Sequence, residues 1–299
     1  MTSPDYLSKG DKVAIVSTAR KISDSEIRPC CETLESWGLA VVLGANLYKE
    51  QNQFAGSDQD RAMDMQSMLD DPDINAIICA RGGYGTVRII ERLDFSAFVK
   101  SPKWLIGFSD VTVLHSHIHA NYNIATLHAP MAINFENNES LEDLREALFG
   151  EELTYSFTLH PANQKGNGTG ELIGGNLSLL YSLMATNSQM DTDGKILFLE
   201  DLDEYLYHID RMMQNLKRAG FLKNLSGLII GGMTEMNDNE IGFGATCEEI
   251  ISSVISDYNF PVAFGFPAGH MKKNVPLILG ATAELVVEDS GCNLKLLQR

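Results

Sequence analysis

Short apolar runs alternate with amphipathic segments along the first half of the chain. Residues 12–17 and 74–80 are apolar over most of their length, a pattern typical of strands buried on both faces. The pattern predicts strands at 12–17, 39–43, 74–80, 104–106 and 124–127. It predicts helices at 24–37, 57–71, 86–93 and 111–120. Because parallel strands need crossover helices, this alternation predicts an α/β parallel sheet that is covered on both faces.

The second half has a different pattern. A helix is expected at 141–149, and the polar stretch after it ends in glycines and asparagines, so 151–169 is predicted to be a linker between domains 1–150 and 170–299. Beyond it, strands are expected at 196–199, 228–230, 262–264, 283–287 and 294–297. Apolar residues at helical spacing predict a helix, and they are Leu202, Leu206, Ile209, Met213 and Leu216. Thr246 and Glu249 form a capping box for another helix. We expect a smaller, β-rich α+β domain here.

Composition narrows the class of protein. The 299 residues are 44% hydrophobic and 21% charged, enough for two domains with sizeable cores. A formal net charge of −17 repels phosphate backbones, so nucleic acid is not an expected partner. There is no basic, apolar leader and no run of ~18 apolar residues, so we expect a cytoplasmic protein without a membrane partner. Five cysteines without a C-x-x-C pair predict reduced thiols and no zinc site.

A candidate nucleophile follows the strand expected at 104–106. Ser109 lies in the segment G-F-S-D, where an apolar strand gives way to a turn and then a helix. This order resembles a nucleophile elbow, which exposes a serine hydroxyl at the sheet edge, although Val111 replaces the second glycine of G-x-S-x-G. The alternative is that Ser109 or Asp110 only caps the helix.

A glycine-rich loop, R-G-G-Y-G at 81–85, follows the strand expected at 74–80. Glycine allows unusual backbone angles and a close approach to a ligand. The loop matches neither G-x-G-x-x-G nor a phosphate-binding P-loop. It is therefore either the source of an oxyanion-binding N–H beside Ser109 or a plain turn.

A serine nucleophile needs a histidine base and a carboxylate that orients it. His128 and His270 both follow strands and are rival candidates for the base. Residues His115 and His119 share a helix face and could bind a metal, but no glutamate completes H-E-x-x-H, so no metal is expected.

The candidate carboxylate is Glu200, which ends an apolar run where an unpaired charge is costly. Asp201 and Asp203 follow it and are expected to cap the next helix. The same capping role is the alternative for Glu200.

Five segments in this order resemble the LD-carboxypeptidase family of serine peptidases. They are R-G-G-Y-G at 81–85, G-F-S-D at 107–110, G-G-N at 174–176, L-E-D at 199–201 with Y-H-I-D-R-M at 207–212, and G-H at 269–270 with N-V-P-L-I-L-G at 274–280. One departure is H-A-P at 128–130, where the family commonly has H-G-P. Each segment is weak alone, but their order over roughly 200 residues is specific.

The resemblance implies a triad of Ser109, Glu200 and His270, and it favours His270 over His128 as the base. It implies a Rossmann-like first domain, a smaller β-rich second domain, a homodimer and no cofactor. The backbone N–H groups of Gly83 and Asp110 are the candidates for the oxyanion hole.

The implied substrate is a small peptide from peptidoglycan, a murein tetrapeptide, from which the enzyme releases terminal D-alanine. An exopeptidase has to recognise the terminal carboxylate, so an arginine is expected nearby. The candidates for substrate binding are Arg81, Tyr84, Tyr207 and Arg211.

Two alternatives stay open. One is an immunity-type hydrolase of peptidyl-nucleotide antibiotics, which would keep the triad and need an aromatic platform for the base. The other is a non-catalytic small-molecule binding protein, which would leave the ordered segments unexplained.

Overall fold

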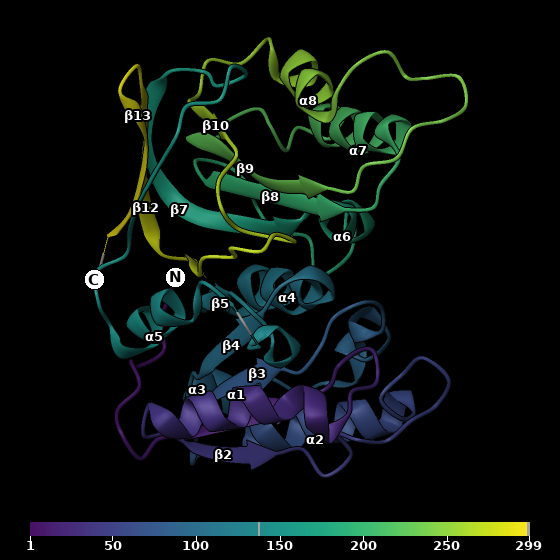
Figure 1. The fold of residues 1–299 in the computed structure, drawn as a ribbon, viewed down its shortest axis with the longest axis vertical. Helices are drawn as coiled ribbons and strands as arrows, with labels where there is room; N and C mark the ends of the chain where they lie inside the picture. Colours follow the sequence, from purple (N-terminus) through teal and green to yellow (C-terminus); the bar gives the residue numbers. More distant parts are fainter. Residues whose placement is uncertain (137, 298–299) are drawn as a thin grey trace.

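The computed structural model describes residues 1–136 and 138–297. The structure contains two β-sheets, built mainly from the first and the second half of the chain, and Figure 1 shows them stacked along the long axis. Within the described ranges the first sheet has six strands in the order β11-β5-β4-β3-β1-β2. Its strands are β1 (Lys12–Val16), β2 (Ala40–Leu43), β3 (Ile74–Cys79), β4 (Trp104–Gly107), β5 (Thr126–His128) and β11 (Leu277–Leu279). Strands β1 to β5 are parallel to one another, as the apolar runs predicted, whereas β11 pairs antiparallel with β5 at the edge of the sheet.

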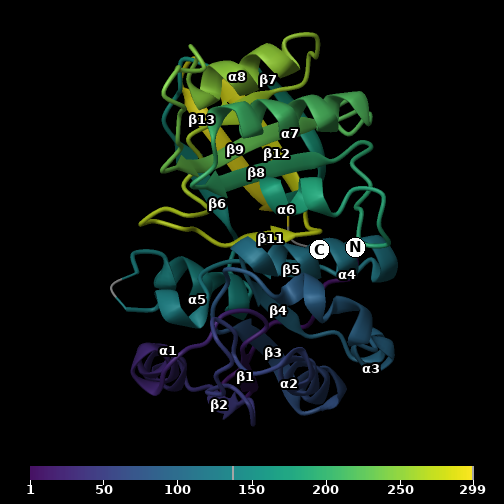
Figure 2. The same cartoon turned by 90° about the vertical axis from the view of Figure 1, so that its right-hand side faces the viewer.

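Helices cover both faces of this sheet because alternate strand residues are apolar on both sides. Val13 and Ile15 pack with residues of α1 and α5, whereas Ala14 and Val16 pack with residues of α2, α3 and α4. Figure 2 shows these two groups of helices on opposite sides of the sheet. The helices are α1 (Asp24–Ser36), α2 (Asp58–Asp70), α3 (Ser96–Lys100), α4 (Thr112–Tyr122) and α5 (Leu141–Phe149).

The second sheet is mixed, with seven strands in the described part of the chain in the order β10-β9-β8-β7-β12-β13-β6. They are β6 (Thr154–Phe157), β7 (Gly166–Asn176), β8 (Ile196–Leu202), β9 (Gly227–Thr234), β10 (Val262–Phe264), β12 (Thr282–Glu288) and β13 (Gly291–Leu297). The long strand β7 joins the two parts of the sheet. Its first residues pair antiparallel with β12 and its last residues pair parallel with β8.

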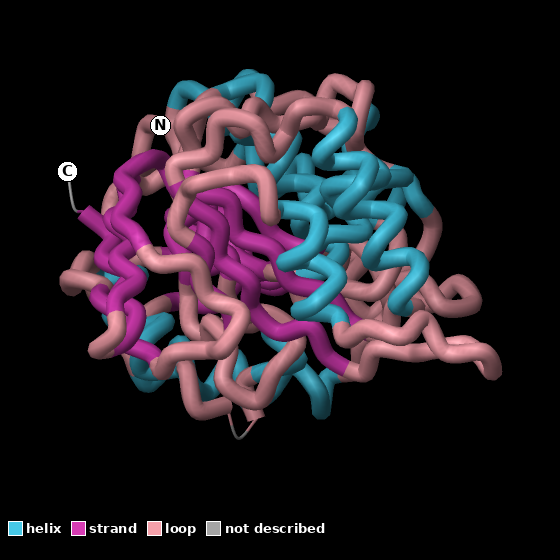
Figure 3. Tube along the Cα trace, turned by 90° about the horizontal axis from the view of Figure 1, so that it is seen from above, coloured by secondary structure: helices cyan, strands magenta, loops and turns pink. Residues whose placement is uncertain are grey.

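Helices gather on one side of this second sheet. They are α6 (Leu177–Ser182), α7 (Leu206–Arg218) and α8 (Cys247–Ile255). In Figure 3 the helices of this half lie on one side of the view and the strands on the other. Ile209, Met213 and Leu216 of α7 are buried against the parallel strands, as their spacing predicted. Within the described residues, no helix combines the length and the apolar character needed to cross a bilayer.

Four expectations differ from the structure. The helix predicted at 86–93 is two short 3₁₀ helices, Thr86–Arg88 and Ile90–Arg92, since four of its residues are β-branched and disfavour an α-helix. The segment 151–169 contains β6 and the beginning of β7. Leu202 belongs to β8 rather than to the helix, and α7 begins at Leu206. Asp201 and Asp203 do not cap α7, whose N-cap is Tyr205.

Candidate active site

Ser109 lies directly after β4, in a turn that leads into a 3₁₀ helix (Ser109–Val111) and then α4. Its backbone has φ +61°, a left-handed conformation that is costly for a residue with a side chain. Such a turn lifts the hydroxyl above the sheet edge, as in a nucleophile elbow. Ser109 is half-buried and lines a pocket, so it is not merely a buried cap.

The next residue ties this turn to the glycine-rich loop. The buried Asp110 carboxylate accepts a hydrogen bond from the Thr86 backbone N–H at 2.8 Å. Burial, which outweighs that hydrogen bond, raises the pKa of Asp110. A side chain at Gly82 would place its Cβ 3.2 Å from Ser109 Cβ. The loop and the elbow therefore pack edge to edge, and only a small residue fits between them.

Glu200 is fully buried at the carboxyl end of β8. The pairing of β8 with β9 changes register between Leu199 and Asp201. Such a bulge commonly redirects a side chain beside an active site. A buried carboxylate needs a partner, and Glu200 finds it in the loop after β10.

That partner is His270. Its Nδ1 lies 2.7 Å from Glu200 Oε2, and its backbone N–H donates to the same oxygen at 3.2 Å. Its Nε2 lies 3.1 Å from Ser109 Oγ. Gly269 permits this approach, because a Cβ there would lie 2.7 Å from Glu200 Oε2. Gly269 has φ +105°, and its N–H donates to the buried Asn274 Oδ1 at 2.8 Å.

The hydrogen bonds define the tautomer of His270. A carboxylate only accepts, so Nδ1 carries the proton and Nε2 is free to accept the Ser109 proton. Burial alone would lower the pKa of His270. The hydrogen bond and charge of Glu200, with the charges of Asp201 and Glu235, outweigh burial, so the pKa is raised above 6.5.

Ser109 and His270 line a pocket of about 490 Å³ where the two halves of the chain meet, and Glu200 is buried behind His270. Both halves supply its lining, with Arg20, Arg81, Ser109 and Asn134 from the first and Asn176, Asp201, Asp203 and His270 from the second. Asp201 is almost fully buried, and burial, followed by the adjacent Glu200 charge, raises its pKa to about 6.

Comparison with known proteins identifies the family. The model of the LD-carboxypeptidase N-terminal domain matches residues 13–129, and that of the C-terminal domain matches residues 169–285. A probable murein peptide carboxypeptidase from Bacillus subtilis is 36% identical over 289 residues, which cover 94% of this chain and 91% of that protein. The chain belongs to the LD-carboxypeptidase family. It is thus a peptidase, in agreement with the resemblance seen in its sequence.

Two solved structures have the same fold as this chain. A muramoyltetrapeptide carboxypeptidase from Oxalobacter formigenes superposes with a TM-score of 0.88 at 28% identity, covering 96% of this chain and 99% of that one. The microcin C7 self-immunity protein has the same TM-score at 23% identity, covering 99% and 98% of the two chains. The second likeness shows a shared fold.

The four residues expected to bind substrate lie in different places. Arg81 lines the pocket and pairs with Glu26 at 3.5 Å. Tyr84 is exposed, with its ring 6.1 Å from that of Phe54. Tyr207 and Arg211 lie together on α7, with the guanidinium 5.1 Å from the tyrosine ring. Of these four, only Arg81 is among the described residues that line the pocket.

The rival base, His128, is not among the described residues that line the pocket with Ser109 and His270. It is fully buried, with its ring 5.8 Å from Phe108 and 5.0 Å from Phe198. Burial is the main cause that lowers the pKa of His128 well below 6.5, so it stays neutral. No hydrogen bond joins His128 to Ser109 in the described structure.

His115 and His119 form a buried hydrogen-bonded chain. Both contact Thr126 Oγ1, at 2.9 and 3.0 Å, and His115 Nε2 lies 2.9 Å from the Gly107 carbonyl oxygen. That carbonyl belongs to the last residue of β4, two positions before Ser109. Burial lowers the pKa of His115 to about 4 and that of His119 to about 3. These neutral rings support the elbow, and the described residues contain no group of three or more potential metal ligands.

Sequence reasoning gave no place in the pocket to three residues that line it, Arg20, Asn176 and Asp201. Asn176 donates from Nδ2 to Asp201 at 2.9 Å, and Asp201 also accepts the Ser178 N–H at the start of α6. Arg20 follows β1 on a loop with no motif around it. A family segment covered Asn176, but no pattern in the sequence indicated Arg20 or the inward position of Asp201.

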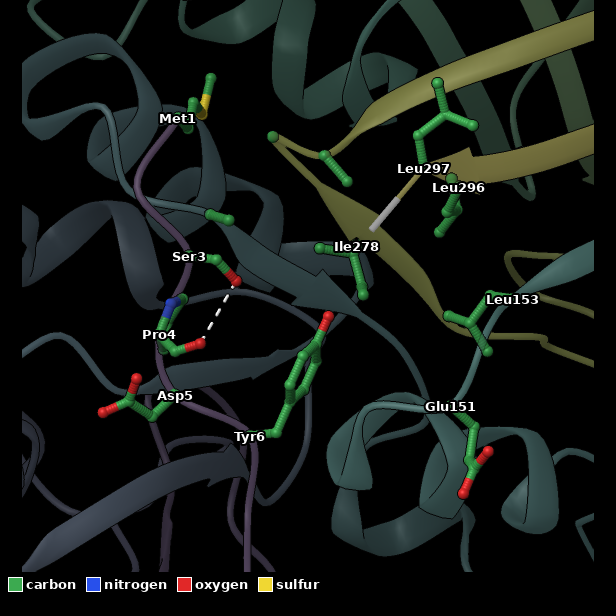
Figure 4. Close-up of a pocket in the computed structure, with 13 residues that line it drawn as sticks. Met1, Ser3, Pro4, Asp5, Tyr6, Glu151, Leu153, Ile278, Leu296 and Leu297 are labelled. Atoms are coloured by element: carbon green, nitrogen blue, oxygen red, sulfur yellow. Dashed lines mark hydrogen bonds between the residues drawn. The ribbon is translucent and has the colours of Figure 1, made fainter. Parts of the chain in front are cut away.

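A second cavity, of about 210 Å³, also lies where the two halves meet. Tyr6, Leu153, Ile278 and Leu296 border it, as Figure 4 shows. Ser109, Glu200 and His270 do not line it. It is therefore separate from the triad pocket.

Proposed function

We propose that this protein is a serine carboxypeptidase that cleaves the L,D-peptide bond before the terminal D-alanine of peptidoglycan tetrapeptides. The proposal rests on one observation: Ser109 Oγ is within hydrogen-bond distance of His270 Nε2, and His270 Nδ1 is hydrogen-bonded to Glu200, at the edge of a pocket. The chain also belongs to a family named for this activity. The muramoyltetrapeptide carboxypeptidase structure, at 28% identity over nearly the whole chain, supports the choice of substrate.

In the proposed mechanism, His270 Nε2 takes the Ser109 hydroxyl proton as Oγ attacks the scissile carbonyl carbon. Glu200 keeps the imidazole in the tautomer that accepts at Nε2, and it stabilises the imidazolium that forms. Collapse of the tetrahedral intermediate breaks the C–N bond, and His270 gives its proton to the leaving amine of D-alanine. Water then attacks the acyl-enzyme with His270 again as the base, which releases the shortened peptide and restores Ser109.

The oxyanion is proposed to bind two backbone N–H groups. Asp110 stands at the start of a helical segment, where N–H groups have no partner inside the helix. Gly83 is exposed in the loop that packs on Ser109. Preorganised donors of this kind typically contribute 10²–10³-fold to the rate.

The proposal extends to the setting of the enzyme. We place it in the cytoplasm, acting on peptides taken back from the cell wall, and as a homodimer, in line with the family resemblance. Size-exclusion chromatography with light scattering tests the dimer, and fractionation of the producing cells tests the location.

The substrate assignment is tested with three compounds. The purified protein is given a tetrapeptide ending in D-alanine, the same peptide ending in L-alanine, and an aminoacyl sulfamoyl nucleoside, and product release is followed by mass spectrometry. Faster hydrolysis of the D-alanine peptide is expected. Preferential cleavage of the nucleoside conjugate would replace this assignment by the immunity-type one. Tight binding without hydrolysis of any compound would favour a binding protein.

A further inference from the structure

We propose that Arg20 binds the free carboxylate at the C-terminus of the substrate, and that this contact restricts the enzyme to the last peptide bond. The inference deepens the proposed function and rests on it. Arg20 lies on the loop after β1, and its side chain lines the pocket that holds Ser109 and His270.

Two adjacent glycines leave room for the Arg20 side chain close to Ser109. A Cβ at Gly82 would lie 3.2 Å from Ser109 Cβ, and a Cβ at Gly83 would lie 2.6 Å from Arg20 Cδ and Nε. The Arg20 side chain therefore packs directly on Gly83, one residue along from the contact with Ser109. The Gly83 N–H is also a proposed oxyanion donor, so the guanidinium lies next to the place where the scissile carbonyl is expected.

The reaction needs a cation at this place. In a peptide, the terminal carboxylate carbon is three covalent bonds from the scissile carbonyl carbon. A group that recognises this carboxylate must therefore lie close to the nucleophile. The planar guanidinium offers two parallel N–H donors that match the two carboxylate oxygens.

Arg20 is also the arginine that is available. Within the described residues its guanidinium makes no ion pair or side-chain hydrogen bond, whereas Arg81 is paired with Glu26. Arg211 stacks on Tyr207 outside the pocket lining. The other charged groups of the lining include Asp201 and Asp203, and the protein carries a net charge of −17. Because Arg81 is already paired with Glu26, Arg20 is the cation that can offset this negative charge for an anionic peptide end.

The test changes the protein and the substrate together. Wild type and Arg20→Met are compared on a tetrapeptide ending in D-alanine and on the same peptide ending in D-alanine amide, by kcat/KM. Wild type is expected to prefer the acid by roughly 10- to 100-fold, the usual scale of hydrogen bonds to charged groups. Arg20→Met is expected to lose that preference, because its kcat/KM falls much more on the acid than on the amide. Arg20→Lys keeps the positive charge but lacks the two parallel N–H donors. It is expected to keep part of the preference for the acid.

Matched controls separate recognition from a general defect. Lys21→Met makes the same kind of change at the adjacent cation, which pairs with Glu50 at 2.5 Å, and is expected to keep the wild-type ratio of acid to amide. Labelling of Ser109 by an uncharged fluorophosphonate is expected to be equal in all variants.

Three outcomes would overturn the inference. An unchanged acid preference in Arg20→Met would exclude Arg20 as the anchor, and its loss in Arg81→Met instead would assign the role to Arg81. Equal losses on acid and amide would show a structural role. A wild type that hydrolyses acid and amide equally well would refute carboxylate recognition while leaving the hydrolase in place, whereas a wild type inactive on both would refute the proposed function as well.

Discussion

At Ser109 three local features act on one residue. The backbone is held at φ +61°, the hydroxyl meets His270 Nε2 at 3.1 Å, and Asp110 ties the turn to the glycine-rich loop. A left-handed residue with a side chain costs about 1–2 kcal/mol, so its surroundings must hold it there. This strain positions the proposed nucleophile and does not stabilise the fold.

The raised pKa of His270 makes a prediction about pH. The base works only when neutral, so kcat/KM is expected to rise with pH through the pKa of His270, above 6.5, and to fall at lower pH. Glu235 is exposed and is one of the charges that raise this pKa. Glu235→Gln removes that charge, so the acidic limb of the profile should move to lower pH.

The measurement is kcat/KM as a function of pH at constant ionic strength, because surface charges are screened by salt. Glu240→Gln, which removes the same charge from a neighbouring exposed residue, is the control and should leave the profile in place. A limb that moves to higher pH in Glu235→Gln would contradict the electrostatic account.

At the scale of elements, strand β7 shows how glycines position the site. Cβ atoms at Gly168 and Gly174 would lie 1.8 Å from the Ser226 carbonyl oxygen and 1.9 Å from that of Phe198. These glycines mark places where backbones pass closely, which is one of the few reasons for glycine in a strand. The strand ends at Asn176, whose side chain fixes Asp201 beside Glu200.

Gly174→Ala is therefore expected to destabilise the protein strongly, by about 3 kcal/mol or more, because the new methyl group would overlap a backbone carbonyl. The control is Gly220→Ala, where φ is also positive, at +85°, but the added Cβ meets nothing within 4 Å. That change should cost only about 1 kcal/mol. Urea unfolding of both variants gives the comparison, and equal losses would show that conformation alone, not close approach, explains Gly174.

Close backbone contacts of this kind also decide which elements can be predicted from the sequence. Strands β1, β3 and β4 contain apolar runs, so their pattern is visible without the structure. Strand β7 reads G-N-G-T-G at its beginning, a pattern that predicts a linker, because close backbone contact requires glycine and leaves no apolar pattern. Strand β11 has three residues, too short for a periodicity. Elements whose identity depends on a distant backbone are hidden from local sequence.

The residues of the candidate site also differ in whether local sequence reveals them. Ser109 and Glu200 could be found because each follows an apolar strand. The choice between His128 and His270 needed either the family resemblance or the structure, since only the structure shows that His128 is enclosed by Phe108 and Phe198. Arg20 was missed because it reaches the pocket through contact with a loop about 60 residues away in sequence.

At the scale of the whole molecule, the proposed triad is divided between the halves. Ser109 comes from the first sheet, and Glu200 and His270 come from the second half. The halves are joined by β11, which follows the His270 loop and pairs antiparallel with β5 of the first sheet. They also meet where the buried Asn176 N–H donates to Thr112 Oγ1 at 3.0 Å. The geometry of catalysis thus depends on contacts between the halves.

Thr112→Val tests one such contact. It keeps the shape but removes the acceptor of a buried N–H, which is expected to cost about 1–3 kcal/mol in the free energy of unfolding. Thr112 is three residues from Ser109, so kcat should also fall while KM changes little. Thr112→Ser keeps the hydroxyl and should retain most stability and activity. Wild-type stability and kcat in Thr112→Val would show that this junction does not position the triad.

The central claim is that Ser109, activated by His270 and Glu200, releases D-alanine from a murein tetrapeptide. The most direct measurement is D-alanine release by wild type and by Ser109→Ala, purified in parallel and followed by mass spectrometry. The account predicts rapid release by wild type and a loss on the order of 10⁶-fold in the variant, the scale seen when a serine peptidase loses its nucleophile. Equal release by both proteins would contradict the account, since hydrolysis would then not depend on Ser109.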